Sequence, residues 1–522
     1  MTPSGSIQSS FSAEVPVISD LSARAPSSEF VERIPINFAR QHALLGLAES
    51  PDAPGRMPVA IADLAALHPL QVLSRFFGRP VAPLLAPAAD IAAAINAAYQ
   101  QRTGQAQNFI ERLDPGTLGD ELKGLNSHDL LDVATRAPVV KVVSLVLFEA
   151  VQARASDVHF QPYEDTLVVR FRIDGVLHNA YDLPKSLQEE IVSRVKVMGR
   201  MNIAEKRLPQ DGRATVQVGD RAIDLRIATL PGSFGERVVV RLLDTSTRLC
   251  DLRELGMEPR EFERFRELIQ IDHGLILVTG PTGSGKTTTL YAALQDINSK
   301  EKNILTLEDP IEYQLQGISQ TQVSEKKGMT FASGLRSVLR QDPDIIMIGE
   351  IRDRETAVMA IQSALTGHLV FSTLHTNDAA SAVARLLDLG IEPYLLASSL
   401  IGVLAQRLLR RLCPECAQPA PANDFDRLLP GVVSPDLSNI KTATGCPTCR
   451  QTGYRGRMGI FELLLVDETI RRHIQGRATA AEIATAATAA GMNTLRQDGA
   501  AKVLKGQTTV DEVLRVTMRS NF

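Results

Sequence analysis

The chain of 522 residues lacks the features of several protein classes. No apolar run approaches the ~18 residues that a membrane-spanning helix needs. The first residues, Met1 to Gly5, show no basic stretch followed by an apolar one, so we expect no secretory leader there. Acidic and basic side chains nearly balance, with a formal net charge of −4, and no overall positive field favours nucleic acid as a partner. These absences predict a cytoplasmic protein that reaches a membrane only through partner proteins.

Cysteine is also scarce, with five residues in the whole chain. Four of them form two C-x-x-C pairs, Cys413 with Cys416 and Cys446 with Cys449, separated by 29 residues. Such pairs favour a tetrahedral Zn²⁺ site, and a redox pair is the alternative. No water-activating acid flanks either pair, so we expect a structural metal. Cys250 stands alone and is expected to be a small buried apolar residue.

The length exceeds what a single hydrophobic core supports, and about two to four domains are expected. An apolar content of 44% and a charged content of 22% are typical of globular protein. Composition and periodicity predict a loose tail, a small α/β domain that docks a partner or serves as a structural cap, a linker, an α+β domain and a phosphate-binding domain. Their predicted ranges are 1–30, 31–103, 104–130, 131–250 and 251–522, the last including a zinc module at 408–458 and C-terminal helices.

One stretch fits the phosphate-loop pattern G-x-x-x-x-G-K-[ST] in full. It consists of Gly280, Pro281, Thr282, Gly283, Ser284, Gly285, Lys286, Thr287 and Thr288. An apolar run at 275–279 reads as a buried strand before it, and a helix pattern follows it. Glycines let backbone N–H groups point at phosphate oxygens. Lys286 would reach the β- and γ-phosphates and Thr287 would contact Mg²⁺, so the sequence predicts a nucleoside triphosphate site.

Three further apolar runs, at 304–307, 345–348 and 369–374, alternate with helix patterns and predict a parallel sheet. Because ligands bind at the carboxyl ends of parallel strands, we expect the residues that follow these runs to gather with Lys286 around one crevice. Those residues are Glu308, Glu350 and His375.

Hydrolysis of a triphosphate needs a metal, positive charge and an oriented water. We assign the orientation of the attacking water to Glu308, with Glu312 as the alternative carboxylate. Glu350 is expected to complete the Mg²⁺ shell with Thr287. His375 is a candidate for sensing the γ-phosphate, while His368 is either a second sensor or a structural residue.

Four arginines are further candidates. Arg226 and Arg241 lie within strand patterns, where they belong either to a solvated face or to a phosphate site. Arg336 and Arg340 lie one helical turn apart, on one side of a predicted helix. They are expected to reach phosphate or an adjoining subunit.

In these motifs the chain resembles the secretion and pilus-assembly ATPases. Their Walker A, Asp box, Walker B and His box correspond to Gly280–Thr288, Glu308–Glu312, Asp344–Asp353 and Thr366–Asn377. Further similar segments are Ser156–His159, Arg207–Arg213 and the tetracysteine module. Within this superfamily the chain is most similar to the type II secretion ATPases, the general secretion pathway protein E group, through Pro35–Ala39 and Ser399–Leu408.

The resemblance implies an α/β architecture: a RecA-like P-loop domain with a parallel-rich sheet, preceded by a PAS-like α+β domain and a small N-terminal domain. It implies a homo-hexameric, Mg²⁺-dependent ATPase that powers pseudopilus assembly and protein export. It also implies that all four arginines approach phosphates, some across subunits. The implied partners are the cytoplasmic domain of an inner-membrane secretion platform protein, on which the first domain docks, and a polytopic platform protein.

Other functions remain open from the sequence. A type IV pilus assembly ATPase has the same chemistry, and the first domain is what distinguishes the two. Retraction motors, by resemblance, lack both the cysteine module and this domain. A nucleotide-gated scaffold with little turnover would also carry the phosphate loop. A nucleic-acid motor is disfavoured, because the chain has no basic stripe with interleaved aromatic residues.

Overall fold

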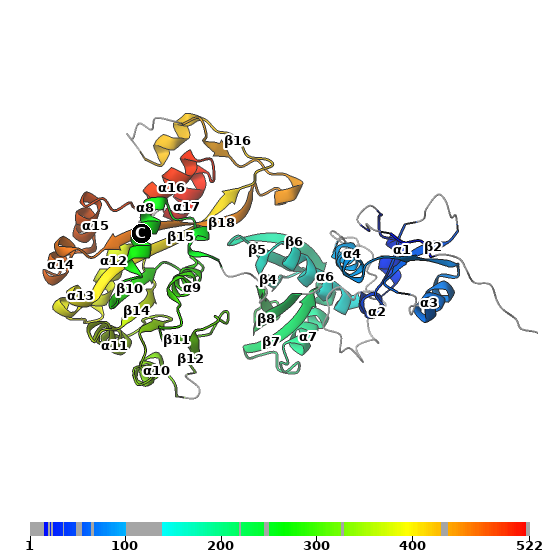
Figure 1. Ribbon diagram of the computed structural model, residues 1–522, viewed down its shortest axis with the longest axis horizontal. Coiled ribbons are helices and arrows are strands. Elements are labelled where there is room, and N and C mark those ends of the chain that lie inside the picture. Colours follow the sequence, from blue (N-terminus) through cyan, green and yellow to red (C-terminus); the bar gives the residue numbers. More distant parts are fainter. Residues whose placement is uncertain are drawn as a thin grey trace, which may run out of the picture. The chain divides into compact units, whose positions relative to one another are not determined.

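A computed structural model describes residues 15–18, 21, 24–34, 36–48, 55–63, 67–100, 138–218, 221–244, 250–324, 328–429 and 437–517. The chain divides into two compact units, Met1–Thr247 and Arg248–Phe522 (Figure 1). The predicted linker at 104–130 lies outside the described residues. Among the helices of the described ranges, none has both the length and the apolarity that crossing a bilayer requires.

The N-terminal part of the first unit is a three-stranded sheet covered by short helices. In the sheet order β1-β2-β3, the first pair is antiparallel and the second is parallel. Its elements are α1 (Ser28–Arg33), α2 (Ile36–Gln41), β1 (Leu44–Gly46), β2 (Met57–Ile61), α3 (Leu67–Phe77), β3 (Val81–Leu85) and α4 (Ala88–Gln100). This arrangement agrees with the predicted small α/β domain.

The prediction of a loose tail over 1–30 is wrong for its described part. Val17 forms a bridge with Leu85 at the end of β3, and Pro26 forms one with Leu47 beside β1. Leu21 is buried, and Ser27 caps the first helix. The apolar residues between the polar ones pack onto the sheet, which the serine- and proline-rich composition concealed. Residues 1–14 lie outside the described ranges.

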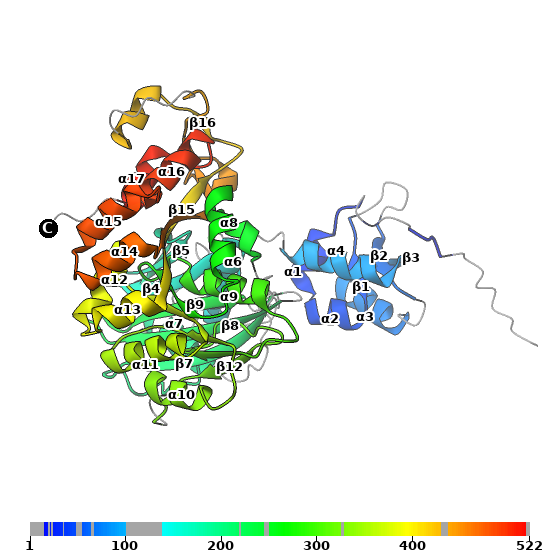
Figure 2. The same cartoon turned by 60° about the vertical axis from the view of Figure 1, so that its left-hand side comes forward.

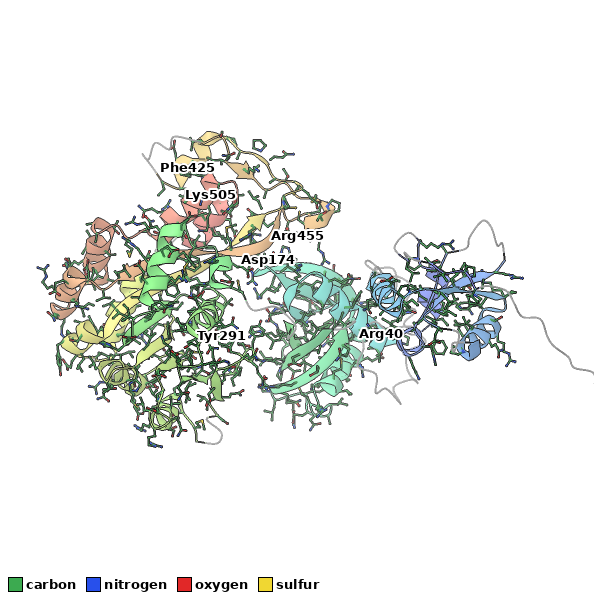
Figure 3. The ribbon with its side chains drawn as sticks, viewed as in Figure 1. Arg40, Asp174, Tyr291, Phe425, Arg455 and Lys505 are labelled. Atoms are coloured by element: carbon green, nitrogen blue, oxygen red, sulfur yellow. The ribbon has the colours of Figure 1, made fainter. Side chains whose placement is uncertain are left out.

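The second part of this unit is an antiparallel sheet of six strands in the order β6-β5-β4-β9-β8-β7. The hairpin between β5 and β6 turns at Asp174 and Gly175, which both have positive φ, as a two-residue hairpin turn requires (Asp174 is labelled in Figure 3). The elements are α6 (Pro138–Gln152), β4 (Ala155–Pro162), β5 (Thr166–Ile173), β6 (Val176–Pro184), η4 (Lys185–Leu187), α7 (Gln188–Met198), β7 (Gln210–Val218), β8 (Arg221–Leu230) and β9 (Arg237–Asp244).

Side chains of these six strands alternate between an apolar face and a charged one. The apolar face packs with α6 and α7 into one core, through residues such as Val158, Phe160 and Val240. Charged residues occupy the alternate positions, because successive side chains of a strand point to opposite faces. Two of them, Arg226 and Arg241, lie directly opposite each other in the β8–β9 register.

The second unit is built on a seven-stranded sheet in the order β12-β11-β13-β14-β10-β15-β18. All neighbours pair in parallel except β15 and β18, as the alternation of strand and helix patterns predicts. The strands are β10 (Gly274–Thr279), β11 (Ile304–Glu308), β12 (Ser319–Gln322), β13 (Ile345–Ile348), β14 (Leu369–Leu374), β15 (Leu400–Leu412) and β18 (Tyr454–Leu465).

Helices cover both faces of this sheet. Helices α8 and α9 share one core with alternate strand residues such as Ile276 and Val278, while α10, α11 and α12 pack on Leu275 and Leu277 of the opposite face. The elements are η5 (Leu252–Leu255), α8 (Pro259–Leu268), α9 (Lys286–Ile297), α10 (Phe331–Val338), α11 (Arg354–Leu365), α12 (Ala379–Asp388) and α13 (Pro393–Ser399). Burial on both faces explains why these strands read as continuous apolar runs.

The cysteine pairs lie in an excursion between the antiparallel strands β15 and β18. It contains β16 (Gln418–Pro419), η7 (Ala422–Arg427), β17 (Lys441–Thr442) and η8 (Pro447–Cys449). The C-terminal helices α14 (Glu468–Gln475), α15 (Ala480–Ala489), α16 (Leu495–Leu504) and α17 (Val510–Thr517) follow β18. Figure 2 shows α16 and α17, in red, beside β15. Glu512 anchors α17 to β15 by accepting a hydrogen bond of 2.8 Å from Arg410.

Candidate nucleotide site and metal centre

The phosphate loop connects the end of β10 to the start of α9. All three of its glycines have positive φ, +149° at Gly280, +79° at Gly283 and +89° at Gly285. A Cβ atom on Gly280 would lie 2.5 Å from the carbonyl oxygen of Gln406, and one on Gly285 would lie 2.8 Å from the Nε2 atom of the same residue. The positive φ strains any side chain at both positions, and at Gly280 the backbone of β15 also leaves no room for one.

Lys286 is the first residue of α9, and its side chain folds back over the loop. Its Nζ atom donates hydrogen bonds to the carbonyl oxygens of Gly280, at 2.8 Å, and Pro281, at 3.2 Å. Burial lowers the pKa of Lys286 to about 8; the Glu350 charge opposes this shift and the Arg407 charge adds to it. The next residue, Thr287, has an exposed side chain at the helix N-terminus. The loop therefore combines backbone N–H groups, a lysine and a hydroxyl, the donor set that suits a phosphate with its metal.

The lowered pKa of Lys286 predicts a pH dependence of nucleotide binding. Its ammonium group is present below about pH 8 and is lost above it, whereas phosphate favours the charged form. Affinity for ADP should therefore fall between about pH 7 and pH 9, with proton uptake on binding near the upper end. Titration calorimetry in two buffers of different ionisation enthalpy measures that uptake. Equal uptake by the Lys286→Ala variant would assign the proton to another group.

Glu350 and His375 lie at the same edge of the sheet as the phosphate loop. Glu350 follows β13 and His375 follows β14, the strand that pairs with β10. The His375 Nε2 atom lies 3.2 Å from Glu350 Oε2, and Arg352 Nε donates to Glu350 Oε1 at 2.6 Å. The Glu350 charge also acts on Lys286. The structure thus brings an acid, a histidine and the loop lysine together at one edge.

Glu308 lies at this edge as well, but it is the last residue of β11 and not the first residue after it. Its side chain is only 3% exposed. The carboxylate accepts hydrogen bonds from Tyr291 of α9, Thr306 of β11 and Gln320 of β12. The alternative carboxylate, Glu312, is half-buried, and its backbone N–H donates to the Tyr291 hydroxyl oxygen at 3.3 Å.

His368 does not join this group. It precedes β14, so it lies at the opposite end of the strand from His375. Its Nδ1 atom is 2.9 Å from the Ser363 carbonyl oxygen at the end of α11. The structural interpretation of His368 therefore holds, and the sensor interpretation is wrong.

The predicted arginines fall into two pairs. Arg336, in the last turn of α10, forms an ion pair with Glu355 of α11, and Arg340 donates to the Arg336 carbonyl oxygen at 2.8 Å. Both side chains are exposed. The other pair, Arg226 and Arg241, belongs to the first unit, where Arg241 forms an ion pair of 3.0 Å with Asp157.

Sequence reasoning missed three residues around the site: Tyr291, Gln320 and Arg407. Tyr291 is a lone aromatic residue in a helix of small and aliphatic side chains, and that contrast could have marked it. Arg407 lies in β15 and donates a hydrogen bond of 2.8 Å to the Asn377 side chain, in the loop after His375. Gln320 carries no local signal, because only the pairing of β11 with β12 brings it to Glu308.

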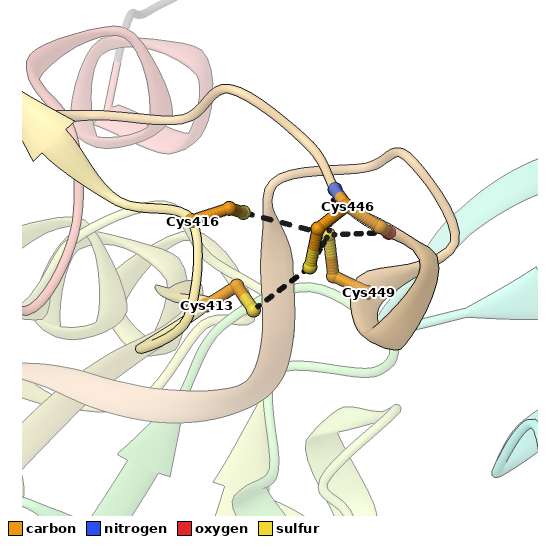
Figure 4. A group of neighbouring side chains, drawn as sticks. All are labelled: Cys413, Cys416, Cys446 and Cys449. Atoms are coloured by element: carbon orange, nitrogen blue, oxygen red, sulfur yellow. Dashed lines mark hydrogen bonds between the residues drawn. The ribbon is translucent and has the colours of Figure 1, made fainter.

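The four paired cysteines converge in space (Figure 4). All four Sγ atoms lie within 4.8 Å of one another. The Cys413–Cys446 and Cys416–Cys449 Sγ distances are 3.8 Å and 3.7 Å, too long for disulfides. A tetrahedron with metal–sulfur bonds of about 2.3 Å has edges of about 3.8 Å. The cluster therefore fits a four-thiolate Zn²⁺ site.

This geometry predicts about one Zn²⁺ per chain, because four thiolates held together without a cation would repel one another. Cys413→Ser or a strong chelator should remove the metal and unfold the excursion between β15 and β18. Metal analysis by mass spectrometry and limited proteolysis of that segment measure both effects. Cys250→Ser, outside the cluster, is the matched control. A metal-free preparation with a protease-resistant excursion would contradict the prediction.

Comparison with known proteins decides the family. Residues 132–515 match the family model described as type II/IV secretion system protein, and residues 13–105 match the MshEN domain model. The chain belongs to the type II/IV secretion system protein family. This match confirms the resemblance that the sequence motifs indicated.

Curated relatives of this family member match over most of its length. It is 48% identical over 492 residues to type II secretion system protein E of Pseudomonas aeruginosa, covering 93% of this chain and 96% of the relative. It is 50% identical over 439 residues to type II secretion system ATPase E of Vibrio cholerae, covering 83% and 86%. The solved structure of the Legionella pneumophila ATPase DotB matches with a TM-score of 0.53 and 21% identity, covering 75% and 99%. This likeness confirms the predicted ATPase fold with its parallel-rich sheet.

Proposed function

We propose that the protein hydrolyses ATP to power assembly of a pseudopilus and protein export by a type II secretion system. The observation that carries this proposal is the sheet edge at which the glycine-bounded loop, Lys286, Glu350 and His375 meet. A related protein with 50% identity is named a type II secretion system ATPase.

In this proposal the loop residues Gly280 to Thr288 bind the triphosphate. Backbone N–H groups and Lys286 hold its oxygens, which neutralises charge that grows as the γ-phosphate departs. Thr287 and Glu350 would hold Mg²⁺, which supplies electrostatic stabilisation when bound. Glu308 orients the attacking water, and His375, paired with Glu350, senses the γ-phosphate.

The arginines complete the site from other positions. Arg336 in α10 and Arg340, just after the end of α10, are exposed, and Arg241 is more than half exposed on the charged face of the first unit. Arginine suits phosphate through its planar, permanently charged fork, and arginines supplied across subunits speed hydrolysis by orders of magnitude. Together with Arg226 they form the basis for proposing a homo-hexamer in which neighbouring copies share sites.

We further propose that the protein works in the cytoplasm, attached peripherally to the inner membrane. Its first domain would dock on the cytoplasmic domain of a secretion platform protein, and its motion would act on the polytopic platform. The tetracysteine cluster would hold Zn²⁺ in a structural role, because its four thiolates leave no open ligand position.

The decisive experiment measures ATP hydrolysis by the full chain with and without the cytoplasmic domain of its secretion partner. We expect turnover to rise when the partner is added, and a strain lacking the gene to regain secretion when the intact gene is restored. Stimulation by a pilus-assembly partner instead, with pili restored and secretion absent, would favour the alternative motor. Binding of ATP without turnover under every condition would favour a nucleotide-gated scaffold.

A further inference from the structure

Glu308 lies in a hydrogen-bond network that links the phosphate-loop helix to the neighbouring strand. Tyr291, in the second turn of α9 after Lys286, donates its hydroxyl hydrogen to Glu308 Oε2. Thr306 Oγ1 and Gln320 Nε2 donate to Glu308 Oε1 at 2.5 Å and 3.0 Å. Figure 3 labels Tyr291 within the unit that carries the phosphate loop. Tyr291 and Glu308 are both buried.

The direction of each bond is fixed by its surroundings. The Gln320 Oε1 atom accepts a hydrogen bond of 2.7 Å from the Leu315 backbone N–H, so the amide nitrogen must face Glu308 and the Tyr313 carbonyl oxygen. Burial, followed by the bond to Glu308, raises the pKa of Tyr291. Its hydroxyl therefore remains protonated at any working pH and acts as the donor.

These three donors occupy most of the acceptor positions of the Glu308 carboxylate. A carboxylate offers about four acceptor positions, two on each oxygen. Thr306 and Gln320 use both positions on Oε1, while Tyr291 uses one position on Oε2. Among the residues that the structure describes, no donor takes the second position on Oε2, which can accept a hydrogen bond from a water molecule.

We propose that Tyr291 and Gln320 are positioning residues, which hold the Glu308 carboxylate so that its remaining acceptor position faces the attacking water. This inference rests on the proposed function, in which Glu308 orients that water. It also couples two parts of the site. The Tyr291 hydroxyl joins α9, which begins at the phosphate-loop lysine, to the Glu308 carboxylate, which orients the water. A shift of α9 during the nucleotide cycle would therefore move Glu308 as well.

The test is Tyr291→Phe in the full chain, which removes one hydroxyl and keeps the ring against Tyr313. We expect kcat to fall by about 10-fold to 100-fold, since a misplaced catalytic group costs that much. The KM for ATP and the affinity for a fluorescent ATP analogue should stay within about twofold. Gln320→Leu should lower kcat in the same way. Tyr394→Phe, an exposed tyrosine on α13, is the matched control and should keep the wild-type kcat.

A double-mutant cycle then separates positioning from general packing. In a Glu308→Gln background, measured by single turnover, adding Tyr291→Phe should cost less than about twofold, because its effect passes through the carboxylate. A full additional loss there, a parallel loss of nucleotide affinity, or a wild-type kcat in the single variant would each overturn the inference. Lys286→Ala tests the proposed function separately: if it abolishes turnover while Tyr291→Phe leaves kcat unchanged, only the inference fails.

Discussion

Lys286→Ala should lower ATP turnover by on the order of 10²–10³-fold, the usual cost of losing one pre-organised donor to transition-state charge. Lys286 is the charged group of the phosphate loop, and its Nζ atom already lies 2.8 Å from the Gly280 carbonyl oxygen, over the place where phosphates bind. Coupled-enzyme measurement of phosphate release gives kcat, and a secretion assay in a strain carrying the variant gives the physiological effect.

The fold should survive this substitution. Lys286 is buried, so removing its charge takes away a desolvation cost together with two hydrogen bonds. An unchanged thermal midpoint would show that lost turnover is a defect of the site. Lys300→Ala, at an exposed position after the same helix, is the matched control. Wild-type phosphate release from Lys286→Ala would refute the assignment of the loop.

Glu308→Gln should keep ATP binding and reduce turnover by on the order of 10²–10⁴-fold, the range contributed by a general base. The amide has the same shape as the carboxylate but carries no negative charge, so it orients a water less well and accepts its proton poorly. Equilibrium binding of a fluorescent nucleotide and single-turnover hydrolysis separate the two effects.

The same substitution at other carboxylates tests which of them orients the attacking water. Glu312→Gln should retain most activity, because Glu312 is the alternative that lies beyond the end of β11. Glu350→Gln should lower the affinity of the site for Mg²⁺, which a metal titration of the hydrolysis rate measures. Glu301→Gln, exposed before β11, is the control for charge alone. If Glu312→Gln or Glu350→Gln gives the phenotype expected of Glu308→Gln, that residue takes over the role.

The local patterns of the second unit predicted its elements closely. The strand expected at 275–279 is β10, and the helix after the loop is α9, which begins at Lys286. The glycine pattern predicts the loop because positive φ and close packing leave no room for a side chain. The C-x-x-C pairs predict the cluster because their spacing brings two thiolates to each side of one metal.

Other features depended on contacts between distant segments. His375 and His368 are both sensor candidates in sequence, with a structural role as the alternative for His368, and the structure places them at opposite ends of β14. The N-terminal stretch around Leu21 resembles a tail in sequence, because its apolar residues are sparse. Its place in the fold depends on contacts with distant residues, such as the bridge between Val17 and Leu85 of β3. The boundaries of the other four segments, the roles of the four arginines and the identity of the water-orienting acid remain predictions.

The sequence by itself determined which chemical groups this protein offers, namely a phosphate-binding loop, acidic residues at strand ends and two cysteine pairs, because each of these is a short local motif. Tertiary structure alone decided which groups face one another. The order β12-β11-β13 brings Gln320 to Glu308, and the packing of α9 on the sheet brings Tyr291 to the same carboxylate. The physical reason is that hydrogen bonds act over about 3 Å, whereas the segments that make them are separated by long stretches of chain.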